Sequence, residues 1–236
     1  STGQRHVVPD EAEFAEIDIK DMDAVSEFWR DFQPDLVNHH AAQADVRISV
    51  EDPAFDASVN VIGTLNVLKS SVDADVRMVI QASTGGAIYG EPETLPVSED
   101  EEARPLSFYG TSKYCTEQYL QTFRRLEGLS YAILRYANVY GPGQRPDGEA
   151  GAVAIFAGLM LRGEKPTIFG AGDKTRDYVY VGDVVRANLL AFDGVDGQVY
   201  NVGTGIQTTD QEVFDAVAEA AGYQGEPLYA DERKGE

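Results

Sequence analysis

The sequence predicts an α/β protein with a doubly wound fold, in which a mostly parallel sheet is covered by helices on both faces. Short apolar runs, as expected of buried strands, alternate along the chain with longer segments whose apolar residues recur every three or four positions, as in amphipathic helices. In addition, 236 residues with 43% hydrophobic content are enough for one substantial core with a smaller lobe docked on it.

Caps and apolar runs predict the elements of the first part of the chain. Asp21 is suited to cap a helix, because its side chain can accept a hydrogen bond from a backbone N–H of the first turn. A second helix is predicted where Val59, Ile62, Leu65 and Leu68 recur on one stripe. In chain order we expect a strand end at 16–19, a helix at 21–32, a strand at 36–40, a helix at 56–71, a strand at 77–82, a helix at 109–126 and a strand at 131–135.

Beyond Gly143 the pattern of predicted elements changes, because a loop rich in Gly and Pro precedes shorter strands and helices. We therefore expect a first domain at 1–141 and a smaller lobe at 142–236, with 181–202 packing back on the sheet. Its predicted elements are a helix at 153–162, strands at 167–169 and 178–181, a helix at 183–192, a strand at 199–202 and a helix at 209–221 capped by Thr208 or Thr209.

A sheet that binds a dinucleotide normally opens with a strand and a glycine-rich turn of the G-x-G-x-x-G type. Backbone N–H groups of that turn and of the following helix hold the pyrophosphate. No such turn precedes Asp18. We therefore expect that this sequence is part of a longer protein, and that the first strand–helix–strand unit and the last elements of the smaller lobe lie outside it.

Charge and composition limit the partners and the compartment. Forty acidic against nineteen basic residues give a net charge of −21, which argues against nucleic acid or an anionic membrane as a partner. The excess suits either solubility or a halophilic source, since at molar salt the Debye length falls to about 3 Å and repulsion is screened. The single cysteine, Cys115, and the lack of a membrane span or secretory signal make a cytoplasmic location the expectation.

The strongest local signal is Tyr109-Gly110-Thr111-Ser112-Lys113. A spacing of four places both side chains on one face of a helix, about one turn apart. An ammonium and a cationic nicotinamide nearby would both favour the phenolate and lower its pKa from about 10 toward neutrality. Tyr109 would then take a proton from a sugar hydroxyl as a hydride leaves the carbon. A core tyrosine with a surface lysine is the alternative interpretation of this spacing.

A polar loop, Ser83-Thr84-Gly85-Gly86, is predicted directly after the strand at 77–82. Ligands of doubly wound sheets bind at the carboxyl ends of strands. The two hydroxyls can bond a sugar oxygen, and the two glycines let a substrate or cofactor approach the backbone. A tight turn with satisfied hydroxyls is the alternative.

Four segments, at 83–90, 109–113, 134–142 and 176–184, together carry a resemblance that covers nearly the whole chain. In order and spacing they are similar to the NAD-dependent epimerase/dehydratase family of extended short-chain dehydrogenases/reductases, and most similar to its UDP-glucose 4-epimerases. The resemblance implies a Rossmann-like fold, NAD as cofactor, a UDP-sugar as substrate and a homodimer formed by helices 56–71 and 109–126. It also implies that 1–141 binds the dinucleotide and that 142–236 binds the nucleotide sugar.

The resemblance implies roles for individual residues. Tyr109 matches the family's base, and Lys113 the lysine that binds the nicotinamide ribose. Thr84 is the expected hydroxyl that bonds the sugar oxygen, although the glycine pair shifts the alignment by one residue and leaves Ser83 open. The implied cofactor-binding residues are Asp18, Ile19, Ala41, Ala42, Gln43, Asn60, Tyr109, Lys113 and Ala137. With Thr84, the implied substrate-binding residues are Asn138, Phe169 and Arg176, whose guanidinium matches phosphate oxygens bidentately.

The reaction that the family carries out is transient oxidation at C4. Tyr109 would remove the C4 hydroxyl proton, NAD would accept the C4 hydride, and a 4-keto sugar would turn over and take the hydride back on its other face. A 4,6-dehydratase is the nearest alternative, but such enzymes usually follow the loop hydroxyl with Asp-Glu, where this chain has Gly85-Gly86. A non-catalytic NAD-binding protein of the same fold is a further alternative. The presence of Tyr109 and Lys113 argues against it.

Other chemistry-bearing residues are predicted to be structural. His39 and His40 are consecutive residues of a strand and face opposite ways, so we expect no metal site. Cys115 is predicted to be a buried thiol rather than a nucleophile, and the acidic run at 98–102 a solvated loop.

Overall fold

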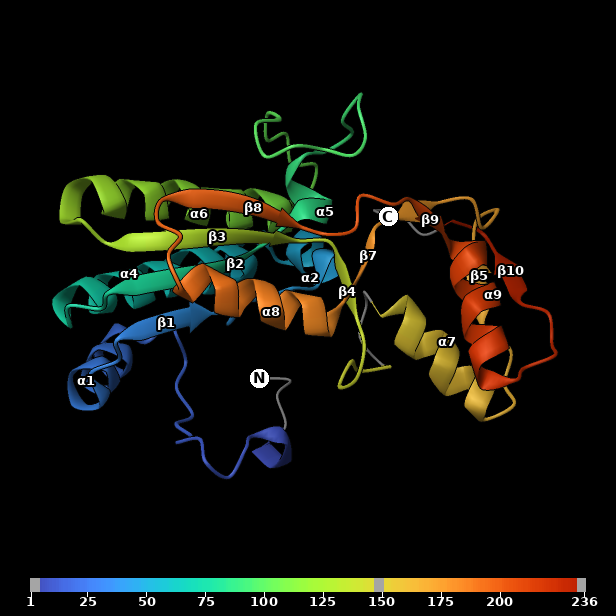
Figure 1. The fold of residues 1–236 in the computed structure, drawn as a ribbon, viewed down its shortest axis with the longest axis horizontal. Coiled ribbons are helices and arrows are strands. Elements are labelled where there is room, and N and C mark those ends of the chain that lie inside the picture. Colours follow the sequence, from blue (N-terminus) through green and yellow to red (C-terminus); the bar gives the residue numbers. More distant parts are fainter. Residues whose placement is uncertain (1–4, 147–150, 233–236) are drawn as a thin grey trace.

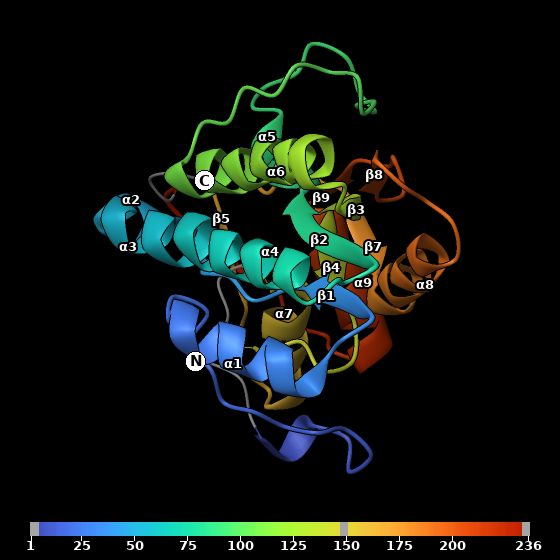
Figure 2. The same ribbon diagram turned by 90° about the vertical axis from the view of Figure 1, so that its left-hand side faces the viewer.

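A computed structural model describes residues 5–146 and 151–232 and shows the predicted α/β fold. A four-stranded parallel sheet has the order β1-β2-β3-β8. Helices α1, α4 and α6 cover one face of this sheet, and α8 covers the other (Figures 1 and 2). The strands are β1 (Leu36–His39), β2 (Met78–Thr84), β3 (Ser130–Tyr136) and β8 (Gln198–Val202), and the helices are α1 (Met22–Phe32), α4 (Gly63–Asp73), α6 (Phe108–Glu127) and α8 (Val181–Phe192).

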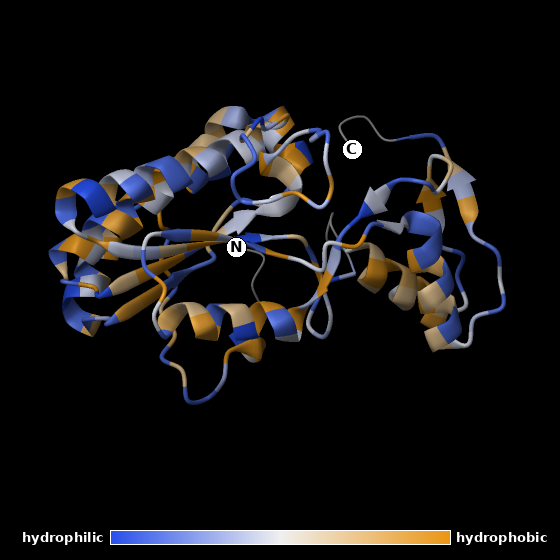
Figure 3. Ribbon diagram, turned by 45° about the horizontal axis from the view of Figure 1, so that its top comes forward, coloured by the Kyte–Doolittle hydropathy of each residue, from blue (hydrophilic) through white to orange (hydrophobic). Residues whose placement is uncertain are grey.

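The two faces of the sheet bury two separate hydrophobic clusters. Successive side chains of a strand point to opposite faces, so Val79 and Ile133 pack with α1, α4 and α6, while Ile80 and Leu134 pack with α8. Figure 3 shows hydrophobic residues in the strands and hydrophilic residues on many turns of the covering helices. Burial on both faces explains why β2 and β3 are continuous apolar runs in the sequence.

The beginning of the chain confirms one prediction and contradicts another. The Asp21 side chain accepts from the Ala24 N–H at 3.1 Å and caps α1, as predicted. Residues 16–19 form no strand, so the expected strand end is wrong. The Asn66 amide donates to the carbonyls of Ile19 and Lys20, at 2.9 and 3.0 Å, in the place where a neighbouring strand would donate.

The helix predicted at 56–71 begins earlier and contains a π-helical turn. It consists of α3 (Pro53–Ala57), the π turn η2 (Ser58–Ile62) and α4, and it starts at the Asp52 N-cap. The expected apolar stripe is confirmed at Leu68, which is fully buried, and wrong at Ile62, which is 50% exposed while Asn60 and Thr64 are buried. The wider π turn changes which residues face the core. A sequence pattern based on 3.6 residues per turn does not predict this change.

The glycine pair after β2 does not form a loop. Ser83 and Thr84 are still in β2, paired with Arg135 and Tyr136 of β3, and Gly85 begins the short helix α5 (Gly85–Ile88). Because Ser83 and Thr84 are successive residues of a strand, their hydroxyls lie on opposite faces of the strand end rather than side by side in a turn.

The smaller part of the molecule lies at one end of the sheet (Figure 1). Its core contains Phe156, Met160, Ile168 and Phe214, between two helices that pack on each other. Thr209 and Glu212 form a capping box at the start of the second helix, which settles the choice between Thr208 and Thr209. The helices are α7 (Ala152–Leu161) and α9 (Asp210–Ala221), and the strands pair as β4 (Asn138–Tyr140) with β7 (Tyr178–Tyr180), β5 (Thr167–Phe169) with β10 (Leu228–Ala230), and β6 (Thr175–Arg176) with β9 (Thr208–Thr209).

Two short helices complete the described chain, η1 (Arg5–Val7) and α2 (Val46–Glu51). Of the helices in residues 5–146 and 151–232, none combines the length and the apolar character that a membrane span requires.

Candidate active site

The start of α6 holds Tyr109 and Lys113 at the carboxyl end of the sheet. Ser107 caps the helix by accepting from the Gly110 N–H at 3.0 Å. Gly110 permits close packing of α5, because a Cβ at this position would lie 2.3 Å from the Ala87 carbonyl oxygen. The first turn of α6 is therefore held directly against the segment that follows β2.

The surroundings of Tyr109 favour the protonated phenol. Burial, with a further contribution from the charge of Asp56, raises the pKa of Tyr109 to about 12. The nearby Thr84 hydroxyl opposes this increase, because a donor close to the phenol oxygen favours the phenolate. The expected decrease of this pKa toward neutrality requires a cationic nicotinamide as well as the Lys113 ammonium, so it stays a prediction.

Lys113 is a buried cation with only 5% of its surface exposed. Burial lowers the pKa of its ammonium to about 8, while the charges of Glu117 and Asp56 oppose the decrease. Within the described residues the ammonium forms no hydrogen bond or ion pair. A buried ammonium without such a partner is suited to bind the oxygens of a ligand.

The two hydroxyls at the end of β2 have different partners. Ser83 is 5% exposed and donates to Oε1 of Glu117. Thr84 is half-buried and lies beside Tyr109. Only the Thr84 hydroxyl is thus placed to act together with the phenol.

A polar cluster joins the loop after β1 to α6. The buried Asn60 amide nitrogen donates to the Gln43 carbonyl at 2.9 Å and to the Ser112 hydroxyl at 3.1 Å, and the Gln43 N–H donates back to Asn60 Oδ1 at 2.8 Å. Ala41 and Ala42 precede Gln43 directly in this loop. The structure therefore brings four predicted cofactor residues, Ala41, Ala42, Gln43 and Asn60, to the side of α6 that carries Ser112.

The remaining predicted residues come from other parts of the chain and have separate surroundings. Asp18 is exposed and forms an ion pair with Lys20, and Ile19 lies over Gly63. Ala137 and Asn138 connect β3 to β4, through bonds from their N–H groups to the Val202 and Asp177 carbonyls. Phe169 ends β5, and the exposed Arg176 lies in β6; in the described chain these strands belong to sheets separate from β1-β2-β3-β8.

The histidines and the cysteine have ordinary surroundings. His39 bonds Thr64 at 3.0 Å, and burial lowers its pKa to about 3, so the ring is neutral. His40 bonds the Tyr136 hydroxyl at 3.1 Å. No group of three or more metal-binding side chains occurs in the parts of the chain that the structure describes. The Cys115 thiol is only partly buried, so the prediction of a buried thiol is wrong. Its partial burial still raises its pKa, which disfavours the nucleophilic thiolate.

A buried ion pair that was not predicted from the sequence lies below the site. Glu117, with no exposed surface, and Arg135, with 6%, are joined by two bonds of 2.6 and 3.1 Å. Arg135 also donates to the Tyr89 hydroxyl at 2.7 Å. Glu117 follows Lys113 at the same spacing of four that separates Lys113 from Tyr109, and Arg135 interrupts an apolar strand, so both signals were present in the sequence.

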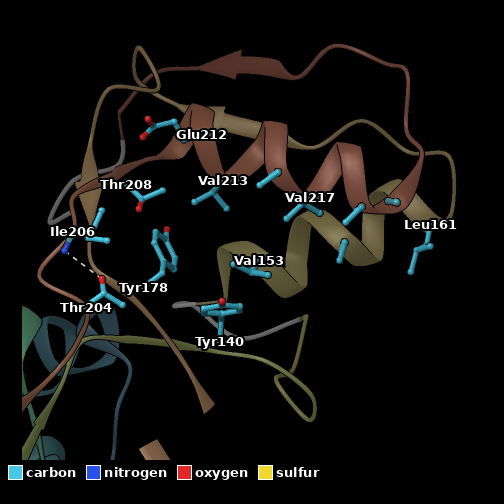
Figure 4. Close-up of a pocket in the computed structure, with 14 residues that line it drawn as sticks. Tyr140, Val153, Leu161, Tyr178, Thr204, Ile206, Thr208, Glu212, Val213 and Val217 are labelled. Atoms are coloured by element: carbon cyan, nitrogen blue, oxygen red, sulfur yellow. Dashed lines mark hydrogen bonds between the residues drawn. The ribbon is translucent and has the colours of Figure 1, made fainter. Parts of the chain in front are cut away.

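A cavity of about 610 Å³ lies in the smaller part of the molecule, between α7 and α9 (Figure 4). Val153, Val213 and Val217 give it an apolar wall, and Tyr140 and Tyr178 lie at one end. None of the residues that the sequence predicts for catalysis, cofactor or substrate lines this cavity. It is therefore separate from the arrangement around Tyr109.

Known proteins resemble this chain over its whole length. The sequence profile of the NAD dependent epimerase/dehydratase family matches residues 1–203. A UDP-glucose 4-epimerase of Mycolicibacterium smegmatis is 44% identical over 96% of this chain and 72% of its own length. Among solved structures, a UDP-glucose 4-epimerase of Thermotoga maritima with UDP-glucose is 50% identical, with a TM-score of 0.98 over 100% of this chain and 76% of that one. A Thermus thermophilus UDP-glucose 4-epimerase in complex with NAD is 45% identical, with a TM-score of 0.95 over 100% and 78%.

Proposed function

Since the chain belongs to the NAD-dependent epimerase/dehydratase family, we infer that it is a UDP-glucose 4-epimerase, which interconverts UDP-glucose and UDP-galactose with NAD as its cofactor. The observation in the structure that best supports this activity is the contact of Tyr109 with the strand-end hydroxyl of Thr84, one helical turn from the buried Lys113 ammonium.

The test is to incubate the purified protein with NAD and UDP-galactose and to follow the sugar by proton NMR. We expect UDP-glucose to form. A product that has lost one water would instead identify a 4,6-dehydratase, for which this chain has glycines at 85 and 86 in place of an acidic pair. Binding of NAD without any turnover of the sugar would identify a non-catalytic NAD-binding protein.

The residues present fit the nicotinamide end of NAD. The unpartnered Lys113 ammonium suits the hydroxyls of a ribose, and the space around Gly86 is open, since a Cβ built there meets no atom within 4 Å. We propose that Lys113 holds this ribose, and that the other contacts to NAD are Asp18, Ile19, Ala41, Ala42, Gln43, Asn60, Tyr109 and Ala137. NAD, when bound, supplies the acceptor and donor of the C4 hydride.

The proton at C4 is assigned to Tyr109. In the chain without cofactor the phenol is protonated at neutral pH, since its pKa is about 12. Positive charge placed beside it on cofactor binding lowers that pKa, and the Lys113 ammonium, with a pKa of about 8, remains mostly charged at pH 7. Tyr109 Oη then takes the proton of the C4 hydroxyl, while Thr84 hydrogen-bonds the same oxygen and keeps it close to the phenol.

The nucleotide is assigned to the smaller lobe. We propose that Asn138, Phe169 and Arg176 contact the nucleotide diphosphate, with the guanidinium of Arg176 on phosphate oxygens. The same proposal divides the chain into a dinucleotide-binding domain at 1–141 and a nucleotide-sugar-binding lobe at 142–236. Pairing of β8 with β3, and packing of α8 on the sheet, support the assignment of 181–202 to the sheet side.

Replacement of Thr84 and of Ser83 should have different effects. Thr84→Ala removes a donor to the reacting oxygens and should cost about 1.5–3 kcal/mol of transition-state stabilisation, a roughly 10- to 100-fold lower kcat. Thr84→Ser, which keeps the hydroxyl, is the control. Ser83→Ala should lower the free energy of unfolding with little effect on kcat, because its hydroxyl is bonded to Glu117. If Ser83→Ala lost the activity and Thr84→Ala kept it, the assignment would be reversed.

We also propose a homodimer that packs α3–α4 and α6 of each subunit. These helices lie side by side (Figure 2) and carry exposed apolar residues, among them Phe55, Ile62 and Tyr119 at 41%, 50% and 40% exposure. Exposed apolar side chains gathered on neighbouring helices are typical of an interface between subunits. A cytoplasmic location remains part of the proposal, and it rests on composition alone.

The acidic surface is proposed to be an adaptation to high salt. At a net charge of −21, mutual repulsion of carboxylates lowers the stability of the folded chain in dilute buffer. Raising KCl from about 0.1 M to about 3 M shortens the Debye length from about 10 Å to below about 3 Å, so the melting temperature should increase. Equal melting temperatures in the two buffers would contradict a halophilic origin of the charge.

A further inference from the structure

A buried carboxylate accompanies the Tyr109–Lys113 pair. Asp56 in α3 is 1% exposed, and its Oδ1 accepts from Gln43 Nε2 at 2.9 Å and from Asn60 Nδ2 at 3.0 Å. Within residues 5–146 and 151–232, no lysine or arginine forms an ion pair with it. The carboxylate is therefore held in place by two neutral amides, and its negative charge is not cancelled by a direct contact.

The fold connects this carboxylate to the helix that carries Lys113. Asp56 and Asn60 are four residues apart, and the π turn η2 begins between them. Asn60 donates to the Ser112 hydroxyl, and Ser112 immediately precedes Lys113. π turns inside helices frequently occur at functional sites. This one lies in a chain of three bonded polar side chains, Asp56, Asn60 and Ser112, which ends on the residue before Lys113.

Other titratable groups lie near Tyr109 and Lys113, on β1 and on α6. From β1, His39 and His40 are neutral at pH 7, since burial and then the charge of Lys113 lower the pKa of both rings. From α6 itself, Glu117 forms its ion pair with Arg135 of β3, and its charge raises the pKa of Lys113 more than that of Asp56 does. Asp56 is the remaining carboxylate whose charge acts on both members of the pair, and it raises the pKa of Tyr109 as well as that of Lys113.

We propose that Asp56 is a positioning residue. Its carboxylate fixes Gln43 and Asn60, which bonds Ser112 of α6, and its charge sets the pH range over which Tyr109 and Lys113 work. The part that concerns catalysis rests on the proposed epimerase function. The activity should rise with pH as Tyr109 loses its proton and fall as Lys113 loses its own. Loss of the Asp56 charge lowers both pKa values, so both limbs of the kcat profile move to lower pH.

The first test needs neither NAD nor sugar. The chain has six lysines, so the ¹³C signals of the lysine ε-carbons can be followed through a pH titration, with Lys113→Met to assign the signal of Lys113. In Asp56→Asn the midpoint of this signal should fall from about 8 by about one pH unit, the lower end of what a neighbouring charge usually causes. Asp52→Asn is the matched control: it removes an equal charge from the exposed N-cap of α3, where asparagine caps equally well, and it should leave the midpoint in place.

The second test is the pH profile of kcat for UDP-galactose. Asp56→Asn should displace the whole profile to lower pH, whereas Asp56→Glu, which keeps the charge, should hold the position of the profile even where kcat falls. A purely structural role predicts an equal loss of kcat at every pH and an unmoved Lys113 midpoint, and that result would overturn the proposal.

Folding and function are separated by two further outcomes. Asp56→Ala is a second variant without the charge, in case the asparagine side chain does not fit. If Asp56→Asn and Asp56→Ala both failed to fold while Asp56→Glu folded, the role of Asp56 would be structural, and the proposal would be overturned. A shifted Lys113 midpoint in a protein whose wild type does not epimerise would support the electrostatic role of Asp56 and refute the proposed function alone.

Discussion

Tyr109→Phe is expected to lower kcat by roughly 10²–10⁴-fold, the usual contribution of a positioned acid–base group. Phenylalanine keeps the ring against α5 and the end of β2, but it removes the oxygen that accepts the C4 proton. Because the hydroxyl acts on the reacting centre, KM for the UDP-sugar should change far less than kcat. Initial rates over a range of UDP-galactose concentrations, with NAD saturating, measure both constants.

Tyr119→Phe provides the matched control. Tyr119 lies on the same helix and is 40% exposed, so the loss of its hydroxyl tests for general effects of the substitution on α6. This control should retain the wild-type rate. A Tyr109→Phe protein as fast as the wild type would mean that another group moves the proton.

Glu117→Gln is expected to destabilise the fold by about 3–5 kcal/mol, because it leaves the buried guanidinium of Arg135 without its counter-charge. The ion pair also orders its neighbours. Ser83 donates to Glu117, Arg135 donates to Tyr89, and the Tyr89 hydroxyl donates to Asn201 of β8 at 2.7 Å. The loss should therefore loosen the end of β2 that carries Thr84, and urea unfolding at neutral pH measures the change in free energy.

The control for this prediction is an exposed ion pair. Glu102 and Arg104 are joined at 2.6 Å, but their side chains are 71% and 73% exposed, so Glu102→Gln should leave the urea midpoint unchanged. Replacement of both buried partners by apolar residues, Glu117→Leu with Arg135→Met, should be less harmful than Glu117→Gln, since no lone charge remains buried. A single variant as stable as the wild type would contradict a structural role of the pair.

Elements with local signals could be predicted from the sequence. The Asp21 and Thr209 caps start α1 and α9, because a side chain that accepts a bond within three residues needs no other part of the chain. The apolar runs at β2 and β3 were visible because both faces of these strands are covered. The strand expected at 16–19 depended on a ladder with a distant strand, and the Ile19 carbonyl at its end is instead bonded by the Asn66 amide.

The sequence predicts that Tyr109 and Lys113 share one helix, but it does not reveal the electrostatics around them. The spacing of Tyr109 and Lys113 puts both on one helix, which the structure has. The choice between Ser83 and Thr84 depends on Glu117, 34 residues from Ser83, and the raised pKa of the phenol depends on burial and on Asp56 from another helix. These influences come from tertiary packing, so no local pattern reveals them. The roles assigned to the individual site residues stay predictions until the variants are measured.

Reversible oxidation at C4, with Tyr109 handling the hydroxyl proton, can be tested by following the C4 hydrogen. UDP-galactose that carries deuterium at C4 is converted in ordinary water, and the UDP-glucose formed is analysed by NMR and mass spectrometry. We expect the deuterium to remain at C4 of the product, because it leaves and returns as a hydride. Replacement of this deuterium by hydrogen from the solvent would rule out hydride transfer at C4.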